Sequence, residues 1–297
     1  MLFTQEIRGK DDWARLFQSA EAFRPLIESI FASYGLPFSQ VDNCTPGTNA
    51  VFRVGSYIIK LFAPPESGFS SGEDYETERF GLSRANRLGA LAPRLLASGT
   101  REDRYRFDYL VMEAVPGQEL GAVSDGFSDA EKQRIGRTLR EFVTQMDTPC
   151  EPFNRHRLRG PAAEARWAAF PGSFLASREA YLAQAVCGAP GYIHGDLTCD
   201  NILVTPEGEL CVIDYADALT APPEVELACI ICEAFRLEKP YLAGFFGAYD
   251  PEALTETCLT GLLLHDFGEN IIRDHFAAPQ DIPDVAALRR LIRAALA

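Results

Sequence analysis

The residues best suited to chemistry lie in two short runs near position 200. The first run contains Asp196 and, five positions later, Asn201, and the second places Asp214 at the end of an apolar stretch. Asp196 can accept or orient the proton of an attacking hydroxyl group. Asn201 and Asp214 offer a neutral and an anionic oxygen, and Mg²⁺ prefers oxygen ligands. The spacing therefore predicts phosphoryl transfer with a bound magnesium ion.

These two runs resemble the aminoglycoside phosphotransferase and choline kinase superfamily. The catalytic loop of that superfamily reads HGD followed by N, as His194, Gly195, Asp196 and Asn201 do here, where protein kinases have HRD. Gly195 therefore favours a small-molecule kinase over a protein kinase. The resemblance implies a protein-kinase-like α+β fold with two lobes, and ATP and Mg²⁺ as cofactors. In this interpretation His194 braces the loop through its ring nitrogens.

Lys60 is a single cation in the apolar run 57–62. Such a charge is costly to bury unless it is paired. The resemblance implies that Lys60 contacts the ATP phosphates and pairs with a helical glutamate. Glu78 matches the family spacing best, and Glu76 is the second choice. The alternative is a lysine on an edge strand that faces water.

The run 45–49 lies between two predicted strands, where the superfamily has its phosphate-covering loop. It lacks the full G-x-G-x-x-G pattern. Thr48 and Asn49 are therefore assigned to the nucleotide phosphates by position, and an ordinary hairpin turn is the alternative.

The segment 110–117 resembles the linker whose backbone binds the adenine edge, so Glu113 and Val115 are assigned there by position. A simple strand end is the alternative. We expect residues 1–115 to form an N-terminal lobe with a helical lead-in and a nucleotide-binding antiparallel sheet. Residues 116–297 would form a larger helical lobe with the catalytic loop, the metal site and the acceptor pocket.

Hydrophobic periodicity predicts the elements that position these residues. A helical segment is expected over residues 11–33, strands over 38–43, 50–54, 57–62 and 109–114, a helix over 72–88, and mainly helices beyond 128, interrupted by short strands at 202–204 and 210–213. Strands followed by helices indicate an α+β arrangement.

The net charge of −14 makes nucleic acid and an anionic membrane surface unlikely partners. Residues 189–284 alone contain 18 acidic and three basic residues. A cationic acceptor is one explanation, with Asp266, Glu269 and Asp274 as contacts to its ammonium groups. Asp266 and Glu269 are three apart and would share a helical face. General solubility is the other explanation.

One position departs from the superfamily. Glu226 lies where relatives usually carry an aspartate, although it can still accept hydrogen bonds. Asp217 also fits a position that is often acidic in relatives, and ranks below Asp214 as a metal ligand. Cys229 and Cys232 form a CxxC in a helical run; we interpret them as packing residues without a redox role.

The leading hypothesis is ATP-dependent phosphorylation of a hydroxyl group on a small molecule, with an aminoglycoside as the most specific expectation. Choline or another amino alcohol or sugar is an alternative acceptor. A catalytically silent nucleotide-binding protein is an alternative of another class, which the intact Lys60, Asp196, Asn201 and Asp214 argue against. The N-terminus has no basic region followed by an apolar signal core, and no stretch approaches the roughly 20 apolar residues that cross a bilayer, so a cytoplasmic location is expected.

Overall fold

The computed structural model describes residues 1–45, 47–69 and 71–297 and has an α+β fold. The chain divides into two compact units. Unit 1 comprises Met1–Pro116 with Tyr215–Asp217, and unit 2 comprises Gly117–Asp214 with Ala218–Ala297. Within the described part of the chain, no helix is both long and apolar enough to span a bilayer.

Unit 1 is built on an antiparallel five-stranded sheet with the order β1-β2-β3-β5-β4. Its strands are β1 (Val41–Asn43), β2 (Ala50–Val54), β3 (Tyr57–Leu61), β4 (Leu95–Glu102) and β5 (Arg106–Glu113). The predicted strands at 38–43, 50–54 and 57–62 correspond to β1, β2 and β3. Strand β4 was not predicted, because it is a largely half-exposed edge strand whose sequence lacks regular alternation of apolar and polar residues.

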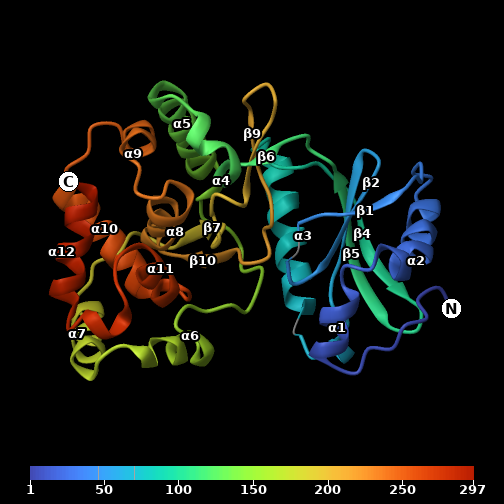
Figure 1. Ribbon diagram of the computed structural model, residues 1–297, viewed down its shortest axis with the longest axis horizontal. Helices are drawn as coiled ribbons and strands as arrows, with labels where there is room; N and C mark the ends of the chain where they lie inside the picture. Colours follow the sequence, from blue (N-terminus) through green and yellow to red (C-terminus); the bar gives the residue numbers. More distant parts are fainter. Residues whose placement is uncertain (46, 70) are drawn as a thin grey trace. The chain divides into compact units, whose positions relative to one another are not determined.

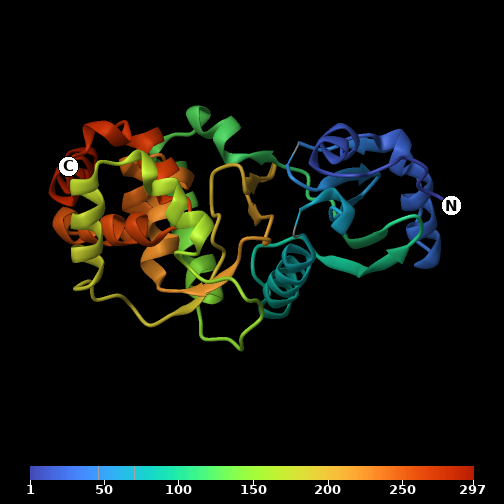
Figure 2. The same ribbon diagram turned by 90° about the horizontal axis from the view of Figure 1, so that it is seen from below.

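Three helices flank this sheet: α1 (Lys10–Leu16), α2 (Ala20–Ser33) and α3 (Ser71–Leu88). The single helical segment predicted over 11–33 is therefore two helices. The break occurs because Ser19 caps α2 by accepting a hydrogen bond from the amide of Ala22. Helices α2 and α3 lie on opposite sides of the sheet, as both ribbon views show (Figures 1 and 2).

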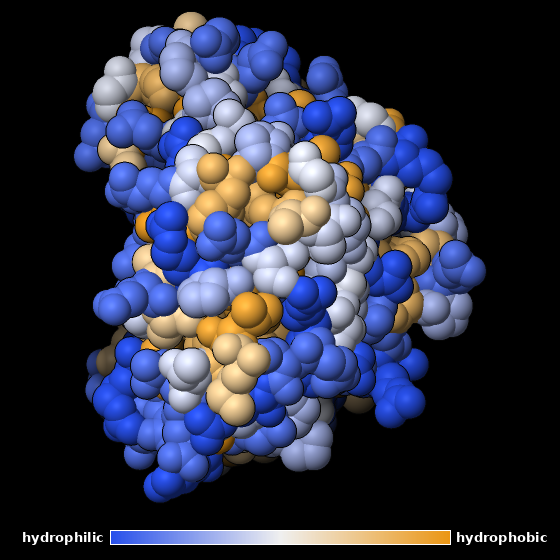
Figure 3. All heavy atoms as spheres, turned by 90° about the vertical axis from the view of Figure 1, so that its right-hand side faces the viewer, coloured by the Kyte–Doolittle hydropathy of each residue, from blue (hydrophilic) through white to orange (hydrophobic). Residues whose placement is uncertain are grey.

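The core of unit 1 is rich in aromatic side chains. Phe23 of α2 packs against Phe3, Trp13, Phe52 and Phe107, with ring centroids 4.8–6.0 Å apart. All five side chains are almost fully buried. The face shown in Figure 3 is mainly hydrophilic and has only separate apolar areas.

Unit 2 is mainly helical and has short strands at one side of its helices (Figures 1 and 2). Its helices are α4 (Leu120–Val123), α5 (Asp129–Met146), α6 (Pro161–Arg166), α7 (Gly172–Leu182), α8 (Pro223–Cys229), α9 (Lys239–Phe246), α10 (Pro251–Leu264), α11 (Gly268–His275) and α12 (Val285–Leu296). Its strands are β6 (Gln118–Glu119), β7 (Gly191–Ile193), β8 (Ile202–Val204), β9 (Leu210–Val212) and β10 (Leu219–Ala221). Strand β7 pairs with β10, and β6, β8 and β9 form a second small sheet.

The β8–β9 hairpin positions the residues of interest in unit 2. Its strands match the predictions at 202–204 and 210–213, and Ile202 pairs with Val212 in antiparallel register. Asn201 precedes β8, and Asp214 follows β9 by two residues. Antiparallel pairing therefore brings Asn201 and Asp214 to the same end of the hairpin.

Candidate active site

The side chain of Asn201 is fixed by the aspartate five residues before it. Its Nδ2 atom lies 2.8 Å from the Oδ2 atom of Asp196 and 2.8 Å from the backbone oxygen of the same residue. Both donors of the amide are thereby used, so Oδ1 is the side-chain atom that remains to accept or to bind a cation. A neutral oxygen beside a carboxylate is a donor set that fits Mg²⁺.

Asp214 is held next to this pair by its neighbour in the chain. The amide of Ile213 donates to the backbone oxygen of Asn201 at 3.0 Å, and the carbonyl of Ile213 accepts from Nε2 of His194 at 3.0 Å. Asp214 itself has a left-handed backbone, with φ of 60°. This conformation is uncommon for residues other than glycine, and aspartate is one of the few that adopt it readily. The backbone of Ile213 therefore ties the segment that carries Asp214 to Asn201 and to the loop that carries Asp196.

His194 braces both segments from the buried side. Its ring is 1% exposed. Because Nε2 donates to Ile213, Nδ1 is the acceptor, and the amide of Asp196 approaches it at 3.4 Å. Both ring nitrogens face backbone groups, so His194 orients the loop.

Glu226 supports the same loop from helix α8. Its Oε1 and Oε2 atoms each lie 3.0 Å from a backbone amide, those of His194 and Gly195 respectively. Burial raises the pKa of the Glu226 carboxyl to about 7, although the two amide hydrogen bonds lower it. Glu226, which stands where relatives usually carry an aspartate, therefore binds the loop with both carboxylate oxygens.

Gly195 needs a left-handed backbone in this loop, with φ of 82°, a conformation that side chains with a Cβ disfavour. Its carbonyl accepts a hydrogen bond from Nε2 of the buried His265 at 3.2 Å. Sequence reasoning did not identify this role of His265. The two residues are 70 positions apart, and the only signal was a histidine next to Asp266 in an otherwise apolar run.

Lys60 is buried in strand β3, and Nζ lies 2.7 Å from Oε2 of Glu78 in helix α3. Both side chains are less than 8% exposed. Glu76, the second choice, instead pairs with Arg79 at 2.6 Å on the exposed side of the helix. Lys60 is therefore an interior lysine held by a carboxylate and does not face water from an edge strand.

The loop before β2 lies close to helix α1. Thr48 accepts a hydrogen bond at its backbone oxygen from Nε1 of Trp13 at 2.9 Å, and Oδ1 of Asn49 accepts from the amide of Ala63 at 3.3 Å. Pro46, which belongs to the same predicted loop, lies outside the described residues.

The predicted adenine-binding residues lie at the end of β5. The amide of Glu113 donates to the Arg94 carbonyl, and that of Ala114 donates to the Ser56 carbonyl, each at 3.0 Å. The Glu113 side chain is exposed, and Val115 follows where the sheet ends. The amide of Glu113 is thus already used within the sheet, and adenine binding by Glu113 and Val115 stays a prediction.

The three residues predicted to contact the acceptor do not all lie on one helix. Asp266 lies in the turn before α11, whereas Glu269 and Asp274 lie within that helix, so the shared helical face expected for Asp266 and Glu269 is wrong. The reason is that α10 ends at Leu264 and the chain is extended at His265.

Each of these three carboxylates already contacts a group of the chain. Asp266 accepts from His156 at 2.8 Å, Glu269 is 6% exposed and pairs with Arg273 at 3.2 Å, and Asp274 is exposed and pairs with Arg273 at 3.1 Å. Hydrogen bonds from His156 and from the Arg159 amide lower the pKa of the Asp266 carboxyl, against the effect of burial, which raises it.

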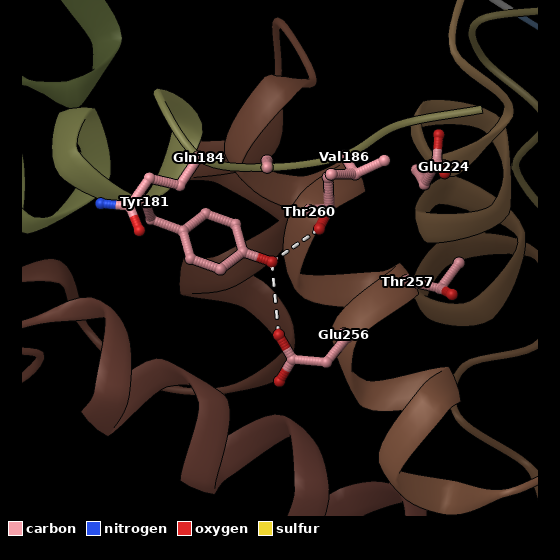
Figure 4. Close-up of a pocket in the computed structure, with 8 residues that line it drawn as sticks. Tyr181, Gln184, Val186, Glu224, Glu256, Thr257 and Thr260 are labelled. Atoms are coloured by element: carbon pink, nitrogen blue, oxygen red, sulfur yellow. Dashed lines mark hydrogen bonds between the residues drawn. The ribbon is translucent and has the colours of Figure 1, made fainter. Parts of the chain in front are cut away.

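A separate cavity of about 390 Å³ lies in unit 2 between α7, α8 and α10 (Figure 4). Its lining residues are Tyr181, Gln184, Ala185, Val186, Glu224, Glu256, Thr257 and Thr260, and this described set includes none of the predicted site residues. The Tyr181 hydroxyl contacts Thr260 and Glu256, and Arg289 neutralises Glu256 at 2.6 Å. These contacts use the chain's own groups, and we assign the cavity no part in catalysis.

Solved structures with the same architecture are phosphotransferases and kinases of small molecules. The GDP complex of wild-type aminoglycoside 2′-phosphotransferase-IIIa is 17% identical over 93% of this chain and 99% of its own, with a TM-score of 0.61. A choline/ethanolamine kinase family protein from Mesorhizobium loti is 14% identical over 89% and 88%, with a TM-score of 0.55. Choline kinase from Streptococcus pneumoniae is 14% identical over 92% and 98%, with a TM-score of 0.53. The fold of this chain is therefore the protein-kinase-like fold of these enzymes.

A family model described as "Phosphotransferase enzyme family" matches residues 47–259. This range covers more than half of the chain and includes Lys60, Asp196 and Asp214. A search of curated proteins finds no match. The chain belongs to the phosphotransferase enzyme family.

Proposed function

We propose that this phosphotransferase moves the γ-phosphoryl group of ATP to a hydroxyl group of a small cationic molecule such as an aminoglycoside. The observation that carries the proposal is the hydrogen bond from Asn201 to Asp196, at the end of the β8–β9 hairpin where Asp214 also lies. Each of the three side chains is of the type that phosphoryl transfer needs.

Asp196 would orient the attacking hydroxyl and accept its proton as the new O–P bond forms. Asn201 Oδ1 and the Asp214 carboxylate would hold Mg²⁺, which supplies positive charge to the phosphate oxygens when bound. The hydrogen bond from Asn201 keeps Asp196 in one orientation, so the acceptor hydroxyl would meet a prepositioned carboxylate.

Unit 1 would bind the nucleotide. The Lys60 ammonium would contact phosphate oxygens, and the buried pair with Glu78 at 2.7 Å would hold it in place for this contact. Thr48 and Asn49 would contribute loop groups to the phosphates. Glu113 and Val115 would meet the adenine edge through their backbone.

The acidic residues of unit 2 support a cationic acceptor. Three carboxylates would bind ammonium groups by exchanging their present partners for the ligand. Asp266 would release His156. Glu269 and Asp274 would release Arg273. Such an exchange keeps the carboxylates paired, which limits the cost of desolvation. Choline or another amino alcohol is the second candidate acceptor, which the structural similarity to choline kinases favours.

The proposal is tested by measuring ADP formation from ATP and Mg²⁺ over a panel of aminoglycosides and amino alcohols, with a neutral sugar alcohol as the control acceptor. We expect ADP formation that depends on a cationic acceptor, with the phosphorylated acceptor recovered in equal amount. Acceptor-independent hydrolysis, or no turnover while Mg-ATP binds, would instead favour a silent nucleotide-binding protein.

A further inference from the structure

Helix α1 lies outside the range matched by the family model, yet it contacts the loop proposed to cover the nucleotide phosphates. Its contact is made by Trp13, one of two tryptophans in the chain. We propose that Trp13 is a positioning residue that fixes the Thr48–Asn49 peptide for phosphate binding. This inference rests on the proposed function, because it assumes that unit 1 binds a nucleotide.

The indole ring of Trp13 is buried and packed against aromatic side chains. The side chain is 1% exposed, and its ring meets Phe23 edge-on, with a centroid distance of 6.0 Å and an interplanar angle of 83°. It also packs beside Phe17 at 6.4 Å. A ring enclosed in this way has little freedom to turn, so the direction of its N–H group is fixed by the aromatic core.

That N–H group donates to the backbone oxygen of Thr48 at 2.9 Å. A buried indole N–H needs an acceptor, and a loop carbonyl needs a donor, so each group satisfies the other. The carbonyl of one residue and the amide of the next point in opposite directions across a trans peptide. The bond to Thr48 therefore turns the amide of Asn49 away from Trp13.

The same short loop is fixed at its other end. Oδ1 of Asn49 accepts a hydrogen bond from the amide of Ala63, just beyond strand β3, which carries Lys60. Backbone amides that point out of a loop in a fixed direction bind phosphate oxygens. Trp13 would thus reduce the ordering that the loop must undergo when a nucleotide binds, which strengthens binding without direct contact.

The test compares binding of Mg-ATP and of adenosine, measured by calorimetry without an acceptor, in the wild type and in Trp13→Phe. A neutral hydrogen bond contributes a factor of roughly 3 to 10 to an equilibrium, so the Kd for Mg-ATP should rise about 3- to 10-fold. The Kd for adenosine, which has no phosphates, should change less than about 2-fold by the same argument.

Phe31→Leu is the matched control, because it loosens the same core at the rings of Phe38 and Tyr57 and removes no hydrogen bond to Thr48. Its melting temperature should fall while its Kd for Mg-ATP stays at the wild-type value. Equal Kd values for Mg-ATP in the wild type and Trp13→Phe would overturn the inference, as would an equal rise in Phe31→Leu and Trp13→Phe.

A second measurement does not need Trp13→Phe, in case that variant does not fold. Two indole N–H signals are expected in a nitrogen-15 NMR spectrum, and Trp167→Phe identifies the other one. Mg-ATP should shift the Trp13 signal, whereas adenosine should not, and an unmoved signal at saturating Mg-ATP would contradict the inference. If the wild type binds no Mg-ATP at all, the proposed function itself fails.

Discussion

Asn201 donates both hydrogens of its side-chain amide to Asp196, one to the carboxylate and one to the backbone oxygen. A single residue thus orients the proposed acceptor of the hydroxyl proton and leaves its own Oδ1 as the side-chain atom available to a cation. The predictions below test this coupling and the groups that support it.

Replacing Asp214 with alanine should weaken the binding of Mg-ATP much more than that of metal-free ATP, because the lost carboxylate acts through the metal. Titrations with and without magnesium separate the two effects. Asp217→Asn is the control, since Asp217 ranks lower as a ligand, and it should leave both affinities within about 2-fold of the wild type. Equal weakening of both forms of ATP by Asp214→Ala would remove Asp214 from the proposed metal site.

Replacing Lys60 with alanine should destabilise unit 1, because Glu78 would remain buried without its cation. Removing one partner of a buried pair typically costs about 3–5 kcal/mol. The double variant Lys60→Met/Glu78→Leu should recover much of this loss, because both charges of this ion pair are then removed together. Urea unfolding measures the effect.

Glu76→Gln is the matched control for the Lys60 series, since it breaks an exposed pair with Arg79 on the same helix. It should change stability by less than about 1 kcal/mol. A loss in Lys60→Ala no larger than in Glu76→Gln would show that the Lys60–Glu78 pair is not buried in solution.

Glu226 predicts a dependence of stability on pH. Its pKa is about 7 in the folded protein, against an ordinary value of 4.5. The folded state therefore binds more protons between these values, and the contribution of Glu226 to stability declines as the pH rises through this window. The total decline is at most roughly 3–4 kcal/mol. Glu226→Gln has no such ionisation.

The measurement is the difference in unfolding free energy between wild type and Glu226→Gln from pH 4.5 to pH 8. The wild type should lose stability relative to the variant as the pH rises. A difference that does not change with pH would mean that the Glu226 carboxyl is hydrated in the folded protein.

The acidic residues of unit 2 predict recognition of a cation. The double change Asp266→Asn/Glu269→Gln should raise the KM for a cationic acceptor and leave kcat nearly unchanged if these contacts are equal in the ground and transition states. Binding of that acceptor should also weaken as salt increases, because salt screens the longer-range attraction between the cation and the acidic segment over about 8–10 Å.

Glu252→Gln is the control for this experiment, because Glu252 is an exposed carboxylate at the start of α10 and pairs with Arg293. Its KM should match that of the wild type. An unaltered KM in the Asp266/Glu269 double variant, for every cationic acceptor that is turned over, would leave the acidic segment with a role in solubility only.

Two kinds of contact could be predicted from the sequence. One is between residues of neighbouring strands, and the other is the pairing of a buried charge with an opposite charge. The β8–β9 hairpin brings Asn201 and Asp214 together because both of its strands carry a clear apolar pattern. Lys60 could be predicted to need an anion, since an unpaired charge in a β-strand interior is costly.

Contacts between distant parts of the chain were not predictable from pattern. His265 donates a hydrogen bond to Gly195, and Trp13 donates one to Thr48. The number of residues between the partners follows no helix or strand periodicity, so the sequence pattern does not indicate either bond. The turn at Asp266 was missed for a similar reason. The apolar run before it continues the helical period, and only the extended backbone at His265 ends the helix.

The most direct test of the central claim is the turnover of Asp196→Asn, measured as phosphorylated acceptor formed per enzyme by phosphorus NMR. The variant keeps the size of the side chain but removes the carboxylate that would take the proton. The account predicts that kcat falls by roughly 10²–10⁴-fold, while the Kd for Mg-ATP remains near that of the wild type. A variant that binds Mg-ATP normally and retains more than about a tenth of the wild-type kcat would contradict the role assigned to Asp196.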